Sequence, residues 1–171
     1  MAVALFQEQI DFHLFVKRSL EALTDDFEFL FRCLQVHVSL AAAYVEGFNS
    51  GFPRALLRQT CEALPVRFTE YFLTEKAGLA EAVALIHSLN QADDIHGLII
   101  DLPPYPGVSQ EQLSIRFNVE KKVELADLDD LMPWEYDLTP HEEEILKVLL
   151  ILEKTFSKAA EQIARLKGYV K

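Results

Sequence analysis

Two acidic residues in the middle of the chain could take part in catalysis or ligand binding. Asp101 directly follows the apolar run IHGLII, and Pro103, Pro104 and Pro106 come next. A carboxylate held where a strand leaves the sheet, on a loop stiffened by prolines, is typical of binding sites in α/β proteins. Glu124 is a second carboxylate, and a carboxylate pair can act as general acid and base. Both acids could equally be solvated surface residues.

Metal and thiol chemistry have no support in the sequence. The five histidines show no H-x-x-x-H or H-E-x-x-H spacing, so we expect no metal site. Cys33 and Cys61 form no C-x-x-C pair, and we expect two reduced thiols in a cytosol-like compartment. His96 is expected to be a structural histidine.

The segments around these residues predict alternating helices and strands. Strands are predicted near 34–40, in VRFTEYFL and in IHGLII. Helices are predicted over 53–64, in LAEAVALIHSLN, and over about 3–33, where the polar residues 24–26 could divide the helix in two. We therefore expect one α/β domain over residues 1–171, with three layers. Its mainly parallel sheet of three or four strands has helices on both faces.

A long helix is predicted to close the chain. Thr139, Pro140 and Glu142 are the start signal, and the first half of the helix is apolar nearly all round. Such a helix has to be covered on most sides, by its own domain or by another chain. We expect residues 140–166 to bury a stripe against a protein partner or a second copy. The residues expected at this interface are Leu149, Ile151 and Phe156.

The charge and the termini argue against several classes of partner. The chain has 16 Lys and Arg against 27 Asp and Glu, a net charge of −11, so we expect it to bind neither nucleic acid nor an anionic membrane. The apolar run 145–152 contains Lys147 and is too short to span a bilayer. The N-terminus resembles neither a secretory signal nor a transit peptide. We expect an intracellular protein, in the cytoplasm or the mitochondrial matrix.

The middle of the chain resembles a known enzyme family. Residues 71–124 follow, without a gap, the folate-binding catalytic half of methylenetetrahydrofolate dehydrogenase/cyclohydrolase, the FolD family. That family reads L-N-x-x-x-x-(I/V)-x-G-I-L-V-Q-L-P-L-P and then K-D-V-D-G. The shared residues are Leu89, Asn90, Ile95, Gly97, Leu102, Pro103 and Lys121. Residues 34–64 match the strand, loop and helix that carry the family's Y-V-x-x-K motif. The resemblance implies the FolD catalytic-domain fold and a link to the one-carbon metabolism of tetrahydrofolate.

The chemistry residues of the family have mostly changed in this chain. Phe52 stands where the family has the tyrosine that stacks on the pterin, and Leu56 where it has the catalytic lysine. Asp101 replaces the glutamine that supports this lysine, and Glu124 replaces the aspartate that binds the pterin edge. A leucine can neither donate a proton nor stabilise developing charge. Arg58 would face another way on its helix, so we do not expect it to substitute for the lysine.

The family's dehydrogenase activity also requires a Rossmann domain for NADP. This chain has six glycines and no G-x-G-x-x-G motif. We therefore expect no cofactor and no oxidation of methylenetetrahydrofolate by the isolated protein.

Three functions remain open. The first is a non-catalytic FolD-like protein that serves as a structural or interaction subunit of a larger assembly. The second is a folate- or pterin-binding or regulatory protein, with a site between Phe52, Asp101, Pro103 and Glu124. The third is an enzyme with altered chemistry, such as a cyclohydrolase or deformylase that uses Asp101 and Glu124. The missing lysine favours the first.

Overall fold

The three strands in the described part of the chain form one parallel sheet. The computed structural model describes residues 11–109, 112–113, 116–124 and 138–168. Strands β1 (Val38–Val45), β2 (Val66–Leu73) and β3 (Gly97–Asp101) lie in the order β2-β1-β3, and both pairings are parallel. The α/β fold class and the parallel sheet are confirmed. The first strand begins at residue 38 and not near 34, because the preceding helix runs further than predicted.

Helices cover both faces of this sheet, as crossover connections between parallel strands require. Helix α3 (Arg54–Glu62) connects β1 to β2, and α4 (Leu79–Gln91) connects β2 to β3. Side chains alternate along β1: Ala42 and Tyr44 belong to the core that includes α3, whereas Ala41 and Ala43 belong to the core that includes α4. All eight residues of β1 are buried, which explains its continuous apolar sequence.

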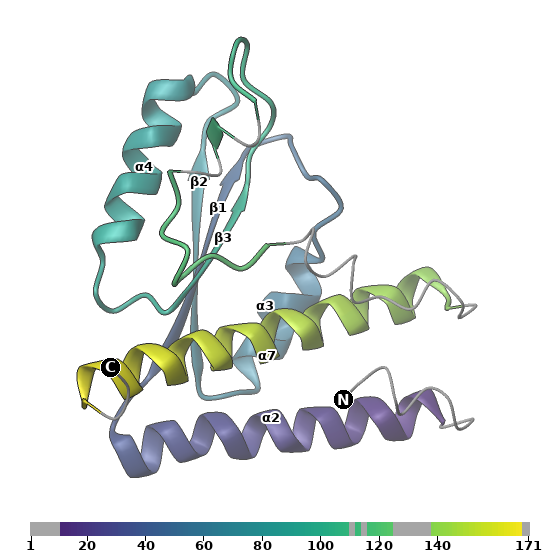
Figure 1. Ribbon diagram of the computed structural model, residues 1–171. Coiled ribbons are helices and arrows are strands. Elements are labelled where there is room, and N and C mark those ends of the chain that lie inside the picture. The colour runs from purple at the N-terminus through teal and green to yellow at the C-terminus, as the bar shows by residue number, and fades with distance from the viewer. Residues whose placement is uncertain (1–10, 110–111, 114–115, 125–137, 169–171) are drawn as a thin grey trace.

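Residues 12–34 form one uninterrupted helix, α2 (Phe12–Leu34), which runs beside the last helix of the chain (Figure 1). The start of helix predicted near residue 3 lies outside the described residues. The polar residues 24–26 do not divide it. Thr24 Oγ1 donates to the carbonyl of Leu20 at 2.7 Å, so the threonine hydroxyl is satisfied within the helix. Gln35 ends the helix in the left-handed conformation, at φ 57°.

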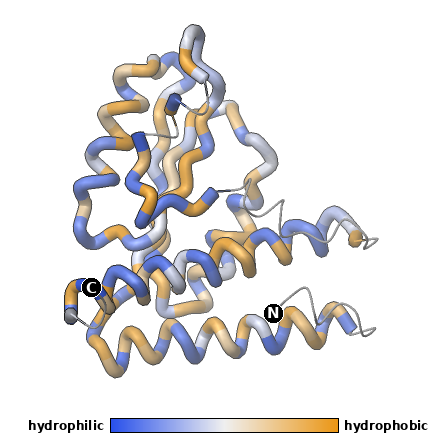
Figure 2. The backbone as a smooth tube through the Cα atoms, in the orientation of Figure 1, coloured by the Kyte–Doolittle hydropathy of each residue, from blue (hydrophilic) through white to orange (hydrophobic). Residues whose placement is uncertain are grey.

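The closing helix α7 (Pro140–Leu166) begins at the predicted signal. The Glu142 amide donates to Thr139 Oγ1 at 3.3 Å, and the Thr139 amide donates to Glu142 Oε2 at 2.9 Å, which is a capping box. Like the other helices, α7 alternates hydrophilic and hydrophobic residues, whereas the strands are mostly apolar (Figure 2). Among the described residues, no helix is long and apolar enough to cross a membrane.

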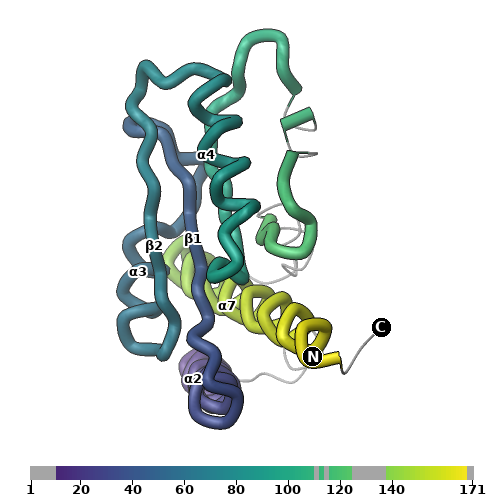
Figure 3. The backbone as a smooth tube through the Cα atoms, turned by 90° about the vertical axis from the view of Figure 1, so that its left-hand side faces the viewer, coloured from purple at the N-terminus to yellow at the C-terminus, as the bar shows by residue number. Residues whose placement is uncertain are grey.

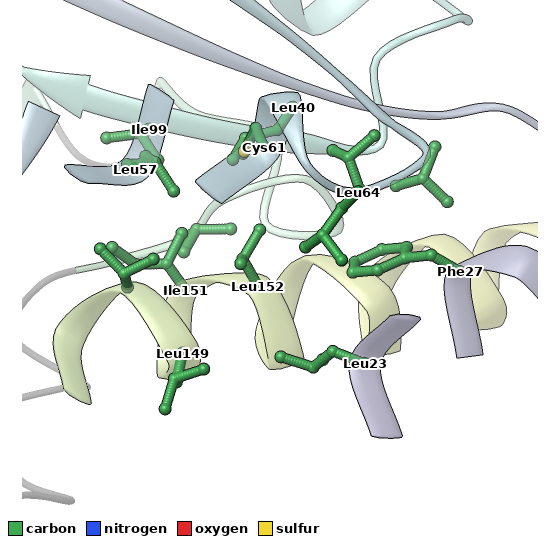
Figure 4. Close-up of a cluster of buried hydrophobic side chains, with 14 of the residues drawn as sticks. Leu23, Phe27, Leu40, Leu57, Cys61, Leu64, Ile99, Leu149, Ile151 and Leu152 are labelled. Carbon is green, nitrogen blue, oxygen red and sulfur yellow. The ribbon is translucent and has the colours of Figure 1, made fainter. Parts of the chain in front are cut away.

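The residues expected to form a partner interface on α7 lie instead in the core of this chain. Leu149 and Ile151 are 6% and 0% exposed. They belong to one cluster with Leu57 of α3 and Phe27 of α2 (Figure 4). Phe156 is half-buried and packs edge-on against Phe27, with ring centroids 5.7 Å apart. Leu149 and Ile151 are therefore not available to a partner, because α2 covers the side of α7 that the sheet and α3 leave open, whereas the interface role expected of Phe156 stays a prediction.

Gly97 allows α7 to pass close to the start of β3. A Cβ atom at this position would lie 2.9 Å from Leu40 Cδ1 and 2.9 Å from Thr155 Cγ2. Any side chain larger than hydrogen would push the helix away from the sheet. This contact accounts for a glycine at one of the positions shared with the FolD pattern.

Candidate functional site

The carboxyl ends of the three strands form the edge at which α/β proteins usually bind ligands. Near this edge, Phe72 of β2, Tyr44 of β1 and Asp101 of β3 are register partners and form a row across the sheet. The loop of residues 46–53, which leaves β1, lies beside this row through contacts of Ser50 with Asp101. These residues define the candidate site.

Asp101 is buried, and both of its carboxylate oxygens are bound. Its residue is 3% exposed. Ser50 Oγ donates to Oδ1 at 2.5 Å, and the Ser50 amide approaches the two oxygens at 3.3 and 3.4 Å. Arg54 Nη2 donates to Oδ2 at 2.9 Å. The possibility that Asp101 is a solvated surface acid is therefore wrong, since the structure makes it one half of a buried ion pair.

Arg54 completes this cluster from the first turn of α3. The same Nη2 also donates to the carbonyl of Phe48 at 2.6 Å, and the guanidinium carbon lies 3.8 Å from the centroid of the Tyr44 ring. Arg54 thus ties the loop after β1 to the end of β3 and covers the central strand. Sequence reasoning missed Arg54. The available signal was an arginine at the start of a helix, at the same sheet edge as the acid.

Arg58, one turn later, takes a separate role. Its Nε and Nη2 donate to the two carboxylate oxygens of Glu70 at 2.7 and 3.0 Å. The side chain of Arg58 is thus engaged by a carboxylate of β2. This pairing leaves Arg54 as the arginine that contacts the candidate site.

Tyr44 remains a neutral phenol at this site. Burial, and then the nearby charge of Glu70, raise the pKa of Tyr44 well above its ordinary value. Its hydroxyl and the Nε of Arg54 are buried and have no hydrogen-bond partner within the described part of the chain. Tyr44 is therefore unsuited to act as a base near neutral pH.

Phe52 and Leu56 lie within the core and do not line an open stacking surface. Phe52 is 3% exposed, and its ring centroid lies 6.1 Å from that of Tyr44. Asn49 Oδ1 accepts from the Phe52 amide at 2.7 Å and so fixes the turn that places this ring. Leu56 is partly buried against the same core. Neither side chain offers a polar group at the positions where the family's tyrosine and lysine would stand.

Glu124 keeps a partly exposed carboxylate, with 35% of its side chain accessible, and it forms an ion pair with Lys122. Lys122 is joined to β3 by a bridge to Leu98. Pro103 is half-buried and lies two residues beyond Asp101 in the loop that leaves β3. The contacts that position Asp101 thus come from the loop after β1 and from α3, as described above.

Two residues shared with the FolD pattern have structural roles here. Lys121 is 7% exposed, and its Nζ donates to the carbonyls of Asn90 and Ala92 at 2.9 and 2.6 Å. The Asn90 amide donates to the carbonyl of Arg116 at 2.7 Å and accepts from the amide of Asn118 at 3.0 Å. These bonds hold the segment after β3 against the end of α4. Asn90 and Lys121 therefore stabilise this part of the fold. Within the described ranges, no group of three or more His, Cys, Asp or Glu side chains could hold a metal ion.

Comparisons with known proteins agree with this fold. No protein-family model and no curated protein sequence matches the chain. Solved structures of FolD enzymes do match it. The bifunctional FolD enzyme from Campylobacter jejuni has 23% identity and a TM-score of 0.55, and the match covers 66% of this chain and 40% of that one. The Trypanosoma brucei FolD, solved with NADP and an inhibitor, has 18% identity and a TM-score of 0.57, over 66% of this chain and 38% of that one. A methylenetetrahydrofolate dehydrogenase from the silkworm Bombyx mori has 9% identity and a TM-score of 0.57, over 69% and 41%.

The chain spans about two fifths of the length of these structures. The fold expected from the resemblance over residues 71–124 is confirmed at this level. It is the fold of part of a FolD dehydrogenase/cyclohydrolase, with a different set of residues at the carboxyl edge of the sheet.

Proposed function

We propose that this protein is a non-catalytic protein of the FolD fold that serves as a structural or interaction subunit of a protein assembly. The observation that carries the proposal is the buried cluster of Asp101, Arg54 and Ser50. This cluster stands where the resemblance places the glutamine that supports the family's catalytic lysine. The lysine position itself holds Leu56.

The groups around Asp101 are poorly suited to proton transfer near neutral pH. Arg54 stays protonated in proteins and cannot serve as a base. The raised pKa of Tyr44 keeps its phenol neutral. The Asp101 carboxylate oxygens are already bound by Arg54 Nη2 at 2.9 Å and by the Ser50 hydroxyl at 2.5 Å. An acid–base mechanism through Asp101 and Glu124 would first have to break this buried ion pair.

A folate- or pterin-binding protein is the second candidate. It is favoured by the partly exposed carboxylate of Glu124, at the position that binds the pterin edge in the family. It is disfavoured by the burial of Phe52, whose ring has no free face to stack on a ligand. The proposed ligand site, between Phe52, Asp101, Pro103 and Glu124, would require the loop after β1 to open.

Two measurements on the full chain test these proposals. We expect methenyltetrahydrofolate to lose its absorbance no faster with the protein than in buffer, and calorimetry with tetrahydrofolate to show no binding. Hydrolysis that is lost in Asp101→Asn but kept in the surface control Glu28→Gln would refute the non-catalytic proposal. Binding that is weakened by Glu124→Ala, without hydrolysis, would favour the second candidate instead.

A further inference from the structure

Strand β2 has an open edge. It pairs with β1 along its whole length, from Val38 with Val66 to Val45 with Leu73. On its other side, no strand of the described part of the chain pairs with it, and it is the outermost strand of the sheet (Figure 3). An edge strand presents alternate N–H and C=O groups to any further strand that can align with it.

This edge lacks the usual protection against pairing. Its sequence, VRFTEYFL, contains no proline, glycine or lysine, and is rich in residues that favour strands. Its acid, Glu70, is held by both nitrogens of Arg58 described above, and only 13% of its side chain is exposed. The carboxylate at the middle of the edge is therefore paired with a cation of its own chain.

The edge strand also has an exposed aromatic side chain and a surface hollow on the same face. Phe72 is 52% exposed, although it is a large apolar side chain. At the other end of the strand a hollow of about 240 Å³ is lined by Val66, Phe68 and Glu70 of β2 together with Arg58, Cys61 and Glu62 of α3. Even-numbered residues of β2 share one face, so Phe72 and the hollow face the same side of the sheet. A two-fold interface requires such self-complementarity.

We propose that a second copy of this chain pairs with the edge of β2, antiparallel to it and centred on Thr69. The sheet of three strands would then continue into an identical sheet across a two-fold axis perpendicular to it. Such an axis keeps each residue on the same face in both copies, so opposite residues are both even-numbered or both odd-numbered. This restricts the register to a few choices.

The register centred on Thr69 satisfies the side chains best. It places Phe72 of the second copy opposite Val66, beside the hollow. It places Arg67 opposite Tyr71 of the second copy, a cation–π pair, and the two Thr69 side chains opposite each other. The register centred on Glu70 would place two acids face to face. The one centred on Phe68 would pair a shorter stretch. The net charge of −11 on each copy opposes association, but at physiological salt it is screened beyond roughly 8 Å.

The proposed interface rests on the proposed function in one respect: it makes a second copy of this chain the partner of the interaction subunit. The dimer itself could form whether or not the protein is catalytic. Its test measures association alone. Failure of the interface and failure of the non-catalytic proposal would therefore be seen in different experiments.

Cysteine cross-linking tests the register. Cys33 is exposed and would be replaced by serine, whereas Cys61 is 2% exposed and burial raises the pKa of its thiol to about 12, so it can remain. On this background we expect Thr69→Cys to form a covalent dimer on mild oxidation, because opposite residues of an antiparallel pair are about 5 Å apart. Tyr71→Cys, which faces Arg67 and not itself, should not. Equal cross-linking of the two variants, or none of Thr69→Cys, would overturn the register.

Analytical ultracentrifugation tests the interface itself. We expect the full-length wild-type chain to dimerise, and Phe72→Glu to raise the dissociation constant at least about tenfold, because a charge would replace the large apolar side chain that packs beside the hollow of the other copy. The matched control is Phe29→Glu, which alters another exposed phenylalanine, on α2, and should leave the dimer intact. Circular dichroism checks that both variants fold. A wild-type chain that is monomeric at about 100 μM, or a dimer that Phe29→Glu weakens as much as Phe72→Glu, would exclude the β2 interface.

Discussion

Arg54 Nη2 lies 2.9 Å from Asp101 Oδ2, and the two side chains are only 18% and 2% exposed. The ion pair connects the first turn of α3 to the last residue of β3. A buried charge that loses its partner is left uncompensated in a medium of low dielectric constant, and this costs far more than the loss of a surface pair.

We therefore expect Arg54→Leu to lower the free energy of unfolding by about 3–5 kcal/mol, because the buried Asp101 carboxyl group would lose its ion-pair partner. Urea denaturation of the purified chain measures this change. The matched control is Arg58→Leu, whose side chain is 49% exposed and whose surface pair with Glu70 should contribute far less to stability. Equal effects of the two variants would contradict a buried structural role for the Arg54–Asp101 pair.

Gly97→Ala should lower the free energy of unfolding by about 1–3 kcal/mol, since the added methyl group would lie 2.9 Å from Leu40 and from Thr155. A second change, Thr155→Ser, removes the methyl group on the α7 side of this contact. The double variant should therefore be less destabilised than the sum of the two single variants. Strict additivity in thermal unfolding would show that α7 does not pass over Gly97 as described.

The stability of the protein should fall in mild acid because of His96. Its Nδ1 accepts a hydrogen bond from the Ser39 amide at 3.1 Å, which requires the neutral ring. Burial, and then the charge of Lys121, lower the pKa of His96, while Asp94 acts in the opposite direction. The unfolded chain then binds the proton more readily than the folded one. The contribution of neutral His96 to the free energy of unfolding is complete above the pKa of the histidine in the unfolded chain, about 6.5. It is lost as the pH falls below this value toward the lower pKa in the folded protein.

Urea midpoints between pH 8 and pH 5 would show this loss. We expect His96→Gln to flatten the dependence in that window. His141→Gln should leave it unchanged, because the His141 side chain is 73% exposed. An unchanged slope in His96→Gln would assign the acid sensitivity to other groups.

Ile151→Ala should destabilise the isolated chain by about 2–5 kcal/mol, as for a fully buried core side chain. Leu166→Ala, on the same helix but 88% exposed, should change little. If Ile151 were a partner residue, its truncation would instead weaken association and leave thermal unfolding of a monomer nearly unchanged. Thermal unfolding at two protein concentrations separates these results.

The fold could be predicted from the sequence because local patterns determine it. The capping box at Thr139 and the strand-favouring run VRFTEYFL are properties of a few neighbouring residues, and the structure has a helix start and a strand at these places. The role of α7 could not be predicted in the same way. An apolar helix looks alike whether its cover is α2 of its own chain or a partner, and only the packing shows which one covers Ile151.

The candidate site was predicted in part. The position of Asp101 at the carboxyl edge followed from the end of an apolar strand. Its binding by Arg54 did not, because the contact depends on how the loop of residues 46–53 folds back over the sheet. The burial of Phe52 depends on the same loop, through the turn at Asn49. The course of this loop over the sheet cannot be predicted from a single sequence.

The matched charges of Arg54 and Asp101 also bear on how freely this chain can change its sequence. In an enzyme, polar groups of the active site are held without full partners so that they can bind the substrate. This lowers the stability of the fold, and interactions elsewhere in the molecule compensate for it. At this edge Arg54 and Asp101 neutralise each other. The unfavourable interactions that are typical of the polar groups in an active site are therefore absent for this pair. A lysine introduced at position 56 would not find a free carboxylate in Asp101, because Arg54 and Ser50 already bind it. The ion pair therefore constrains positions 54 and 101 to change together, since a change at either one alone leaves a buried charge without its partner.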